Sequence, residues 1–307
     1  MDMYQNHFHL KASPFNLGPD PKFLYLTDTL REALSVLAYG VTARKGFVQL
    51  TGEVGTGKTT LLNMFLQSLQ AKGAATAFIF NPHLDPDEVL DFVMADFGVE
   101  PTSTSKSRAM LQFNRWLLDL YSEDRLAVLF VDEAQQLSPA VLEELRLLTN
   151  LETPTHKLLQ IVICGQPELD ALLERLSLSQ LRQRITLRCR TARLSAEQTR
   201  EYIAQRLRVA DAGEHQIFEP DAVGLVHRFS GGIPRLINSI CEQSMIESFC
   251  DGAESVSAEV IEKVAREMGL TAHVTVVPEI RTVRVPAFKK GKVAGMGKKL
   301  FARERNQ

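Results

Sequence analysis

Residues 52–59 constrain the fold more than any other stretch of the chain. They read Gly-Glu-Val-Gly-Thr-Gly-Lys-Thr and fit the pattern G-x-x-x-x-G-K-[S/T] at every fixed position. An apolar segment, residues 46–51, precedes them, and a segment with helical patterning follows. Glycines let such a loop curl until its N–H groups point inward, and the start of the helix favours an anion. The stretch predicts a strand, a phosphate-binding loop and a helix in succession.

This loop supplies the first set of candidate residues. The expected nucleoside triphosphate contacts are Gly52, Glu53, Val54, Gly55, Thr56, Gly57, Lys58, Thr59 and Thr60. We expect Lys58 to reach the β- and γ-phosphates and to act in catalysis, and the Thr59 hydroxyl to bind Mg²⁺.

A second motif follows about 75 residues later. The apolar run of residues 126–131 ends in Asp132 and Glu133. Asp132 is expected to hold Mg²⁺, directly or through water, and Glu133 to take a proton from an attacking water. An acidic pair at this place favours hydrolysis over phosphoryl transfer to a small acceptor.

The order of the predicted elements defines the fold class. Strands are predicted at residues 47–51, 76–81, 126–132, 159–164 and 185–190, with helices between them such as 86–97 and 109–120. Residues 101–107 form a predicted polar loop, and Ser138-Pro139 is a predicted helix start. Alternating strands and helices indicate an α/β P-loop domain with a five-stranded parallel sheet. Four helices, at 195–209, 219–229, 233–250 and 257–268, predict a small helical bundle after the sheet.

Four parts of the chain follow from this order of elements. They are an N-terminal segment (1–45), the α/β domain (46–192), a helical domain (193–270) and a tail (271–307). Residues 278–307 carry a net charge of +7, which leaves −9 on residues 1–277. We expect this end to be a mobile tail, either solvated without a partner or bound to an anionic one: nucleic acid, acidic lipid or acidic protein.

Several classes of protein do not fit the sequence. No apolar run approaches the roughly 18 residues of a membrane span, and the N-terminus lacks the pattern of a secretory signal. The cysteines, Cys164, Cys189, Cys241 and Cys250, lack metal-ligand spacing, so we expect core packing in a reducing compartment. The histidines show no ligand spacing either, and Mg²⁺ is the expected metal. A cytoplasmic location follows, peripheral at the inner membrane if the partner is there.

Several unrelated short motifs occur in one order over residues 1–268. They include 52–60, Asp132-Glu-Ala-Gln135, Gly165-Gln-Pro-Glu-Leu169, residues 180–185 (Gln-Leu-Arg-Gln-Arg-Ile) and residues 231–238 (Gly-Gly-Ile-Pro-Arg-Leu-Ile-Asn). In these motifs the chain resembles the AAA+ ATPases, and among them the general secretion pathway protein A family. The resemblance implies ATP as the nucleotide. Full-length members carry a membrane segment and a peptidoglycan-binding region after the ATPase, where this sequence has only a short basic tail.

The resemblance also implies roles for single residues. Gln166 corresponds to the polar sensor residue, and Asn81 to a position that restrains the hydrolytic glutamate, although Asn81 also suits a plain turn before Pro82. Arg235 corresponds to the lid arginine that binds the γ-phosphate. Arg184 matches the arginine finger that acts on ATP held by a neighbouring subunit, with Arg182 as the alternative.

The N-terminal aromatics have two interpretations. Pro14, Phe15 and Tyr25 either pack near the adenine or belong to an ordinary core.

The expected function is an assembly-type ATPase that forms a ring or filament. Its partner would belong to a cell-envelope system: type II secretion, a type IV pilus or exopolysaccharide export. A DNA-bound ATPase of transposition-regulator type is the main alternative, which the basic tail favours although the sequence shows no DNA-binding module. A nucleotide-gated adaptor that scarcely hydrolyses ATP is a third, and the intact Asp132 and Glu133 argue against it.

Overall fold

A computed structural model describes residues 3–18, 20–79, 84–103, 105–213 and 215–272 of the chain. Asn81 and the basic residues 278–307 lie outside this range, so the expectations for them stay predictions. Among the described residues, no helix is both long and apolar enough to cross a membrane.

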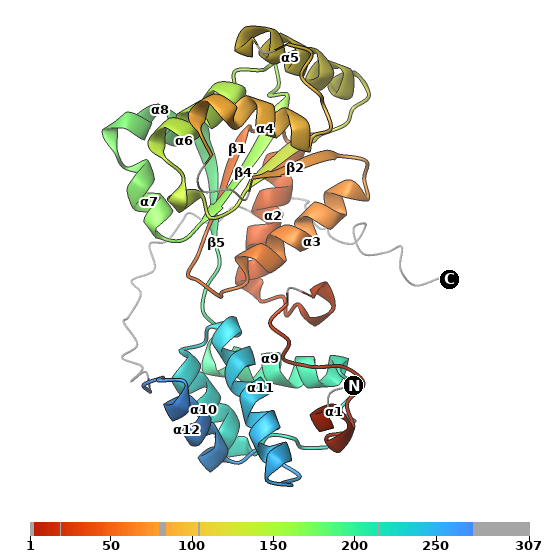
Figure 1. The fold of residues 1–307 in the computed structure, drawn as a ribbon, viewed down its shortest axis with the longest axis vertical. Helices are drawn as coiled ribbons and strands as arrows, with labels where there is room; N and C mark the ends of the chain where they lie inside the picture. The colour runs from red at the N-terminus through yellow and green to blue at the C-terminus, as the bar shows by residue number, and fades with distance from the viewer. Residues whose placement is uncertain (1–2, 19, 80–83, 104, 214, 273–307) are drawn as a thin grey trace, which may run out of the picture. The chain divides into compact units, whose positions relative to one another are not determined.

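A five-stranded parallel sheet forms the centre of the α/β part, in the order β2-β3-β4-β1-β5 (Figure 1). Its strands are β1 (Phe47–Thr51), β2 (Ala75–Ile79), β3 (Ala127–Val131), β4 (Leu159–Gly165) and β5 (Ile185–Arg190). Every neighbouring pair is parallel. All residues of β1, β3 and β4 are buried, as expected for strands covered on both faces. The predicted fold class is confirmed.

Alternate residues of each strand pack into two different cores. Val128, Phe130 and Val162 belong to the core beneath α2 (Asp28–Thr42) and α3 (Lys58–Gln70). Leu129 and Ile161 belong to the core on the opposite face. That face is covered by α4 (Val89–Asp96), α5 (Lys106–Ser122), α6 (Pro139–Leu148), α7 (Glu168–Leu173) and α8 (Ser179–Arg184) (Figure 1). The two-residue period of a strand therefore assembles a three-layer unit.

Small differences from the predicted bounds have local causes. Residues 86–97 divide into a 3₁₀ turn, η2 (Pro86–Glu88), and α4. Helix α5 begins at Lys106, inside the predicted loop 101–107. The prediction missed its first residues because they are polar and the apolar periodicity starts only at Ala109. The predicted start of α6 is confirmed: the Ser138 hydroxyl accepts the Val141 N–H, and Pro139 is the first helical residue.

Four further helices share a third core. They are α9 (Ala196–Val209), α10 (Pro220–Ser230), α11 (Pro234–Cys250) and α12 (Ala258–Glu267). Ser195 and Gln198 form a capping box at the start of α9.

The first residues of the chain belong to this helical core, not to the sheet. Tyr4, Phe8, Phe15 and Phe23 are all buried among the residues of α9–α12. The Tyr4 hydroxyl donates to Glu242 Oε1 on α11 at 2.6 Å. Helix α2, by contrast, packs its apolar face on the sheet. The segment 1–45 is therefore divided between two cores, because each half carries an apolar face that suits a different neighbour.

Three of the four cysteines are buried, as expected, and the fourth is not. Cys164, Cys189 and Cys241 are buried, and burial raises the pKa of the Cys189 thiol to about 12. Cys250 is exposed because it is the last residue of α11. Core packing was the wrong expectation for Cys250.

Candidate functional site

The loop between β1 and α3, residues 52–57, has a backbone that only glycine allows at its key positions. Gly55 and Gly57 have positive φ angles of 79° and 94°. A Cβ at Gly52 would lie 1.9 Å from Thr191 Oγ1, and one at Gly55 would lie 2.8 Å from Arg235 Cβ. The glycines therefore permit both the curl of the loop and the close approach of its neighbours.

Lys58, the first residue of α3, folds back over this loop. Its side chain is buried, and Nζ donates to the carbonyl oxygens of Gly52 at 2.8 Å and Glu53 at 3.0 Å. The Thr56 hydroxyl also donates to the Glu53 carbonyl, at 2.7 Å. The ammonium group thus stands inside the curl of the loop, where an anion would meet it.

The next residue joins the loop to the acidic strand. Thr59 Oγ1 donates to Asp132 Oδ2 across 3.1 Å, although the two residues are 73 positions apart in sequence. A hydroxyl and a carboxylate at this separation are hard oxygen ligands of the kind that Mg²⁺ takes. The residues present therefore fit a magnesium ion.

Glu133 lies beside the same cavity and has an unusual backbone. Its φ angle is 52°, in the left-handed region that few non-glycine residues adopt. Oε2 accepts hydrogen bonds from Gln135 Nε2 at 2.6 Å and from Gln166 Nε2 at 3.1 Å. Burial is the largest effect on the Glu133 pKa and raises it, but these amides and the charge of Lys58 outweigh burial and lower that pKa below its usual range. The carboxylate is thus kept ionised.

Gln166 owes its place to the strand order. It directly follows β4, which lies between β1 and β3. Its side chain is therefore delivered between the loop after β1 and the acidic pair after β3. Its observed partner is Glu133.

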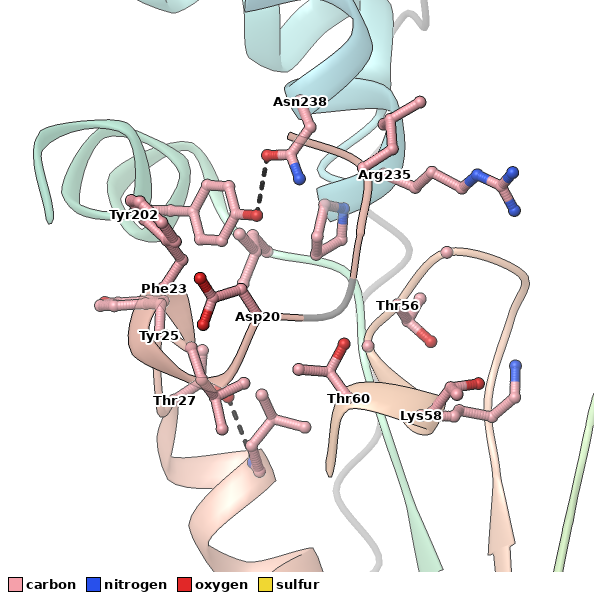
Figure 2. Close-up of a pocket in the computed structure, with 18 of the residues that line it drawn as sticks. Asp20, Phe23, Tyr25, Thr27, Thr56, Lys58, Thr60, Tyr202, Arg235 and Asn238 are labelled. Atoms are coloured by element: carbon pink, nitrogen blue, oxygen red, sulfur yellow. Dashed lines mark hydrogen bonds between the residues drawn. The ribbon is translucent and has the colours of Figure 1, made fainter. Parts of the chain in front are cut away.

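A cavity of about 340 Å³ opens beside the loop, within the size range of small-molecule sites (Figure 2). At one end are the loop residues, Lys58 and Glu133. At the other end it is lined by Asp20, Phe23, Tyr25, Tyr202 and Asn238, among others. Figure 2 shows Tyr202 donating a hydrogen bond to Asn238 Oδ1, at 2.8 Å.

The N-terminal aromatics separate into a lining group and a core group. Tyr25 lines the cavity, and its hydroxyl donates to Glu201 on α9. Phe15 is fully buried in the helical core, where it meets Phe218 edge to face at 5.8 Å. Phe23, which had no predicted role, also lines the cavity, and the buried Arg206 guanidinium lies 4.8 Å from its ring centroid.

Arg235 stands at the start of α11 and borders the cavity. Its backbone N–H donates to the Gly55 carbonyl at 3.2 Å, and Figure 2 shows its side chain extending over the loop. The guanidinium is exposed, and among the described residues it makes no hydrogen bond or ion pair. It is thus free to meet an anion.

The two candidate finger arginines lie elsewhere. Arg184 Nη1 donates to Thr149 Oγ1 at 2.8 Å, at the end of α6, and Arg182 is exposed. Neither is among the described residues that line the cavity.

Sequence reasoning missed three residues that contact the site residues. Gln135 holds Glu133, Thr191 Oγ1 lies 2.6 Å from Thr56 Oγ1, and Arg193 forms an ion pair with Glu53. The Arg193 ion pair lowers the Glu53 pKa. Gln135 was visible as part of the Asp-Glu-Ala-Gln motif; Thr191 and Arg193 follow β5, and no local pattern indicates that β5 lies next to β1.

The sheet order, the glycine loop and the acidic pair after β3 together define a P-loop protein of the AAA+ class. Residues 41–173 match the family model described as an AAA domain. Two solved structures share the fold. Cdc6p from Pyrobaculum aerophilum aligns with a TM-score of 0.61 at 21% identity, covering 81% of this chain and 70% of that one. A chain in the structure of Drosophila ORC bound to DNA gives 0.61 at 19% identity, covering 88% and 66%.

General secretion pathway protein A of Aeromonas hydrophila is 43% identical over 255 residues, which are 83% of this chain and 46% of that protein. The chain thus spans less than half the length of this relative. It is an AAA+ protein similar to general secretion pathway protein A, and the resemblance predicted from its motifs is confirmed.

Proposed function

We propose that the chain binds ATP with Mg²⁺ in this cavity and hydrolyses it to ADP and phosphate. The observation that carries the proposal is the hydrogen bond of Thr59 to Asp132, with Glu133 bordering the same cavity. This bond joins the glycine loop to the acidic strand, so that one site holds groups for phosphate, for a cation and for a proton.

The loop and Lys58 bind the phosphates in this proposal. Lys58 exchanges its bonds to the Gly52 and Glu53 carbonyls for phosphate oxygens, and the N–H groups at the start of α3 face the same anion. Thr59 and Asp132 would hold Mg²⁺, which when bound neutralises the charge that develops on the phosphate oxygens.

Glu133 is the proposed general base, and Gln166 the residue that orients it. An ionised carboxylate within hydrogen-bond reach of water accepts its proton as the phosphorus–oxygen bond forms. Because the bonds from Gln135 and Gln166 favour the ionised form, Glu133 is ready to accept a proton at neutral pH.

Two arginines complete the proposed site. Arg235 binds the γ-phosphate from α11, which makes the contact between α11 and the loop depend on the nucleotide. Arg184 acts in trans on ATP held by the next subunit of a ring or filament. Its hydrogen bond to Thr149, outside the described lining of its own cavity, supports this role.

Nucleotide binding and turnover in two variants test the proposal. Lys58→Ala should weaken ATP binding, because a charge on the phosphates is lost. Glu133→Gln should bind ATP as the wild type does and turn over about 10² more slowly, the scale of a lost general base. Equal affinity and equal turnover in wild type and Glu133→Gln would contradict the mechanism.

We further propose that ATP turnover serves a cell-envelope system, with a partner at the inner membrane. The support is the 43% identity to general secretion pathway protein A, within the half of that protein that this chain spans. Recovery of the protein with inner-membrane fractions, dependent on ATP and lost in Lys58→Ala, tests the location. A protein that is never recovered there would contradict it.

A DNA-dependent ATPase is the second candidate, favoured by the +7 charge of residues 278–307. It predicts that DNA stimulates ATP turnover and that the stimulation falls as salt rises, since phosphate contacts release counterions. Turnover with and without DNA at two salt concentrations separates the two candidates.

A further inference from the structure

Three residues form a closed ring of hydrogen bonds behind the cavity. Gln135 Nε2 donates to Glu133 Oε2 at 2.6 Å, and Gln135 Oε1 accepts the backbone N–H of Gln166 at 3.0 Å. Gln166 Nε2 closes the ring with its own bond to Glu133 Oε2, at 3.1 Å. The ring joins the turn after β3 to the turn after β4.

The surrounding backbone is shaped to admit the Gln135 amide. Gln135 lies in the 3₁₀ turn η3 (Ala134–Gln136), directly after Glu133. A Cβ at Gly165, the last residue of β4, would lie 2.7 Å from Gln135 Oε1. Glycine at this position therefore lets the amide reach the Gln166 N–H.

Glu133 needs such support because its own backbone is strained. A non-glycine residue at a φ of 52° costs on the order of 1 kcal/mol or more, and it persists only where its surroundings hold it. Two amides from two different turns hold the carboxylate. Both use Oε2, so neither amide occupies Oε1.

We infer that Gln135 is a positioning residue that aims the Glu133 carboxylate and ties it to Gln166. The inference rests on the proposed function. Gln135 is not among the described residues that line the cavity, so it acts through Glu133 and touches no reacting atom. Its own bond uses Oε2 and does not block Oε1.

The chemistry of the ring predicts what its loss would do. Without the amide of Gln135, the carboxylate loses its 2.6 Å hydrogen bond and its link through Gln135 to the turn after β4, so it can rotate. Turnover should fall on the order of tenfold, the lower end for a hydrogen bond to a charged group. ATP affinity should change by less than about twofold, since phosphate-binding groups are untouched.

The experiment is a double-mutant cycle in the full chain: wild type, Gln135→Met, Glu133→Gln and the double variant. Methionine matches glutamine in length but offers no amide donor. Gln112→Met is the matched control, because Gln112 also bridges two segments, accepting from Thr102 and donating to the Glu100 carbonyl, on α5 and outside the cavity. Each protein is measured for ATP turnover, ATP affinity and the midpoint of thermal unfolding.

The inference requires that Gln135→Met slow turnover, leave ATP affinity unchanged and have no further effect on turnover once Glu133 is glutamine. Gln112→Met should change neither turnover nor ATP affinity. Equal fold-losses in both backgrounds would mean that Gln135 acts independently of Glu133 and would overturn the inference. If Gln135→Met does not fold, Gln135→Asn, whose amide is set back by one methylene group, takes its place in the cycle with the same results required.

Failure of the proposed function gives a different result. In that case Glu133→Gln turns over as the wild type does, or no protein turns over. The unfolding midpoints still test the ring: the losses from Gln135→Met and Glu133→Gln should be non-additive if the two side chains are bonded. Additive losses would overturn the inference whatever the activity.

Discussion

At the scale of single residues, Glu133 is both strained and held. Its left-handed backbone and its two amide partners keep an ionised carboxylate beside Lys58 and the cavity. The folded-state pKa of Glu133 is depressed, and this direction has consequences for both stability and activity.

The pH dependence follows from that direction. The stability that ionised Glu133 contributes is complete above its ordinary pKa of about 4.3 and is lost as pH falls through the lower folded-state pKa. Because Glu133 stays ionised above that range, we expect its titration to cause no change in kcat/KM between about pH 6 and 8. Gln166→Leu removes a donor and should move the acid limb upward. A wild-type limb between about pH 6 and 7 that Glu133→Gln abolishes would contradict this expectation.

At the scale of elements, the turn before α11 is hydrogen-bonded to the segment that leads into α9 and packs closely against it. The Leu194 N–H donates to the Gly232 carbonyl at 2.8 Å, and a Cβ at Gly232 would lie 2.0 Å from the Leu194 carbonyl oxygen. Gly232 also has a φ of 76°. The glycine therefore meets two demands at once, backbone conformation and close packing.

Gly232→Ala should lower the free energy of unfolding by more than about 2 kcal/mol, since left-handed strain and a backbone clash add together. Gly224→Ala is the matched control. Gly224 is exposed inside α10, and a methyl group there would have no atom within 4 Å, so alanine should stabilise by about 0.5–1 kcal/mol. Thermal or denaturant unfolding measures both, and equal effects at the two glycines would contradict the assignment.

Elements with strong local signals were predictable from the sequence. The glycine loop, the five strands and the capped helices carry apolar periodicity, glycine or proline at positions that local physics requires. What the sequence does not contain is the pairing of distant residues. The order β4-β1-β5 places Thr191 and Arg193 against the loop, and the sharing of Phe15 and Phe23 with α9–α12 likewise arises from tertiary packing alone. Gln135 can be noticed in the sequence as part of the Asp-Glu-Ala-Gln motif. Its role can be inferred only once the fold has placed Gln166 beside it.

At the scale of the whole molecule, the position of Arg184, bonded to Thr149 and not among the described residues that line its own cavity, leads to a test of assembly. ATP turnover per subunit should rise with protein concentration, and Arg184→Ala should lower it by roughly 10³ while ATP affinity is spared. Mixing Arg184→Ala with Glu133→Gln subunits should restore part of the activity, because an intact Glu133 can then meet an intact Arg184. The same measurements on Arg182→Ala show whether Arg182 or Arg184 is the arginine that acts on the neighbouring subunit. No rescue, with turnover independent of concentration, would indicate a monomeric enzyme.

The basic end of the chain gives the second test at this scale. Residues 278–307 carry a net charge of +7 and little apolar patterning, so truncation after Val277 should leave the unfolding midpoint and ATP turnover unchanged. Binding to DNA or to anionic vesicles should be lost, and in the intact chain it should fall steeply between low and physiological salt. A truncated protein that fails to fold, or that binds both surfaces as before, would contradict the prediction.

The sharing of one core by residues 4–23 and helices α9–α12 also bears on how the protein is made. During synthesis the first aromatic residues emerge roughly 180 positions before the helices that bury them, which at about 5–20 residues per second is a delay of roughly ten to forty seconds. Over that interval the α/β part can complete its sheet, while Tyr4, Phe8 and Phe15 remain unburied because α9–α12 have not yet been synthesised. The beginning of the chain is thus among the last parts to be buried, and the nascent protein presents an aromatic segment that a chaperone can hold until translation has passed α11.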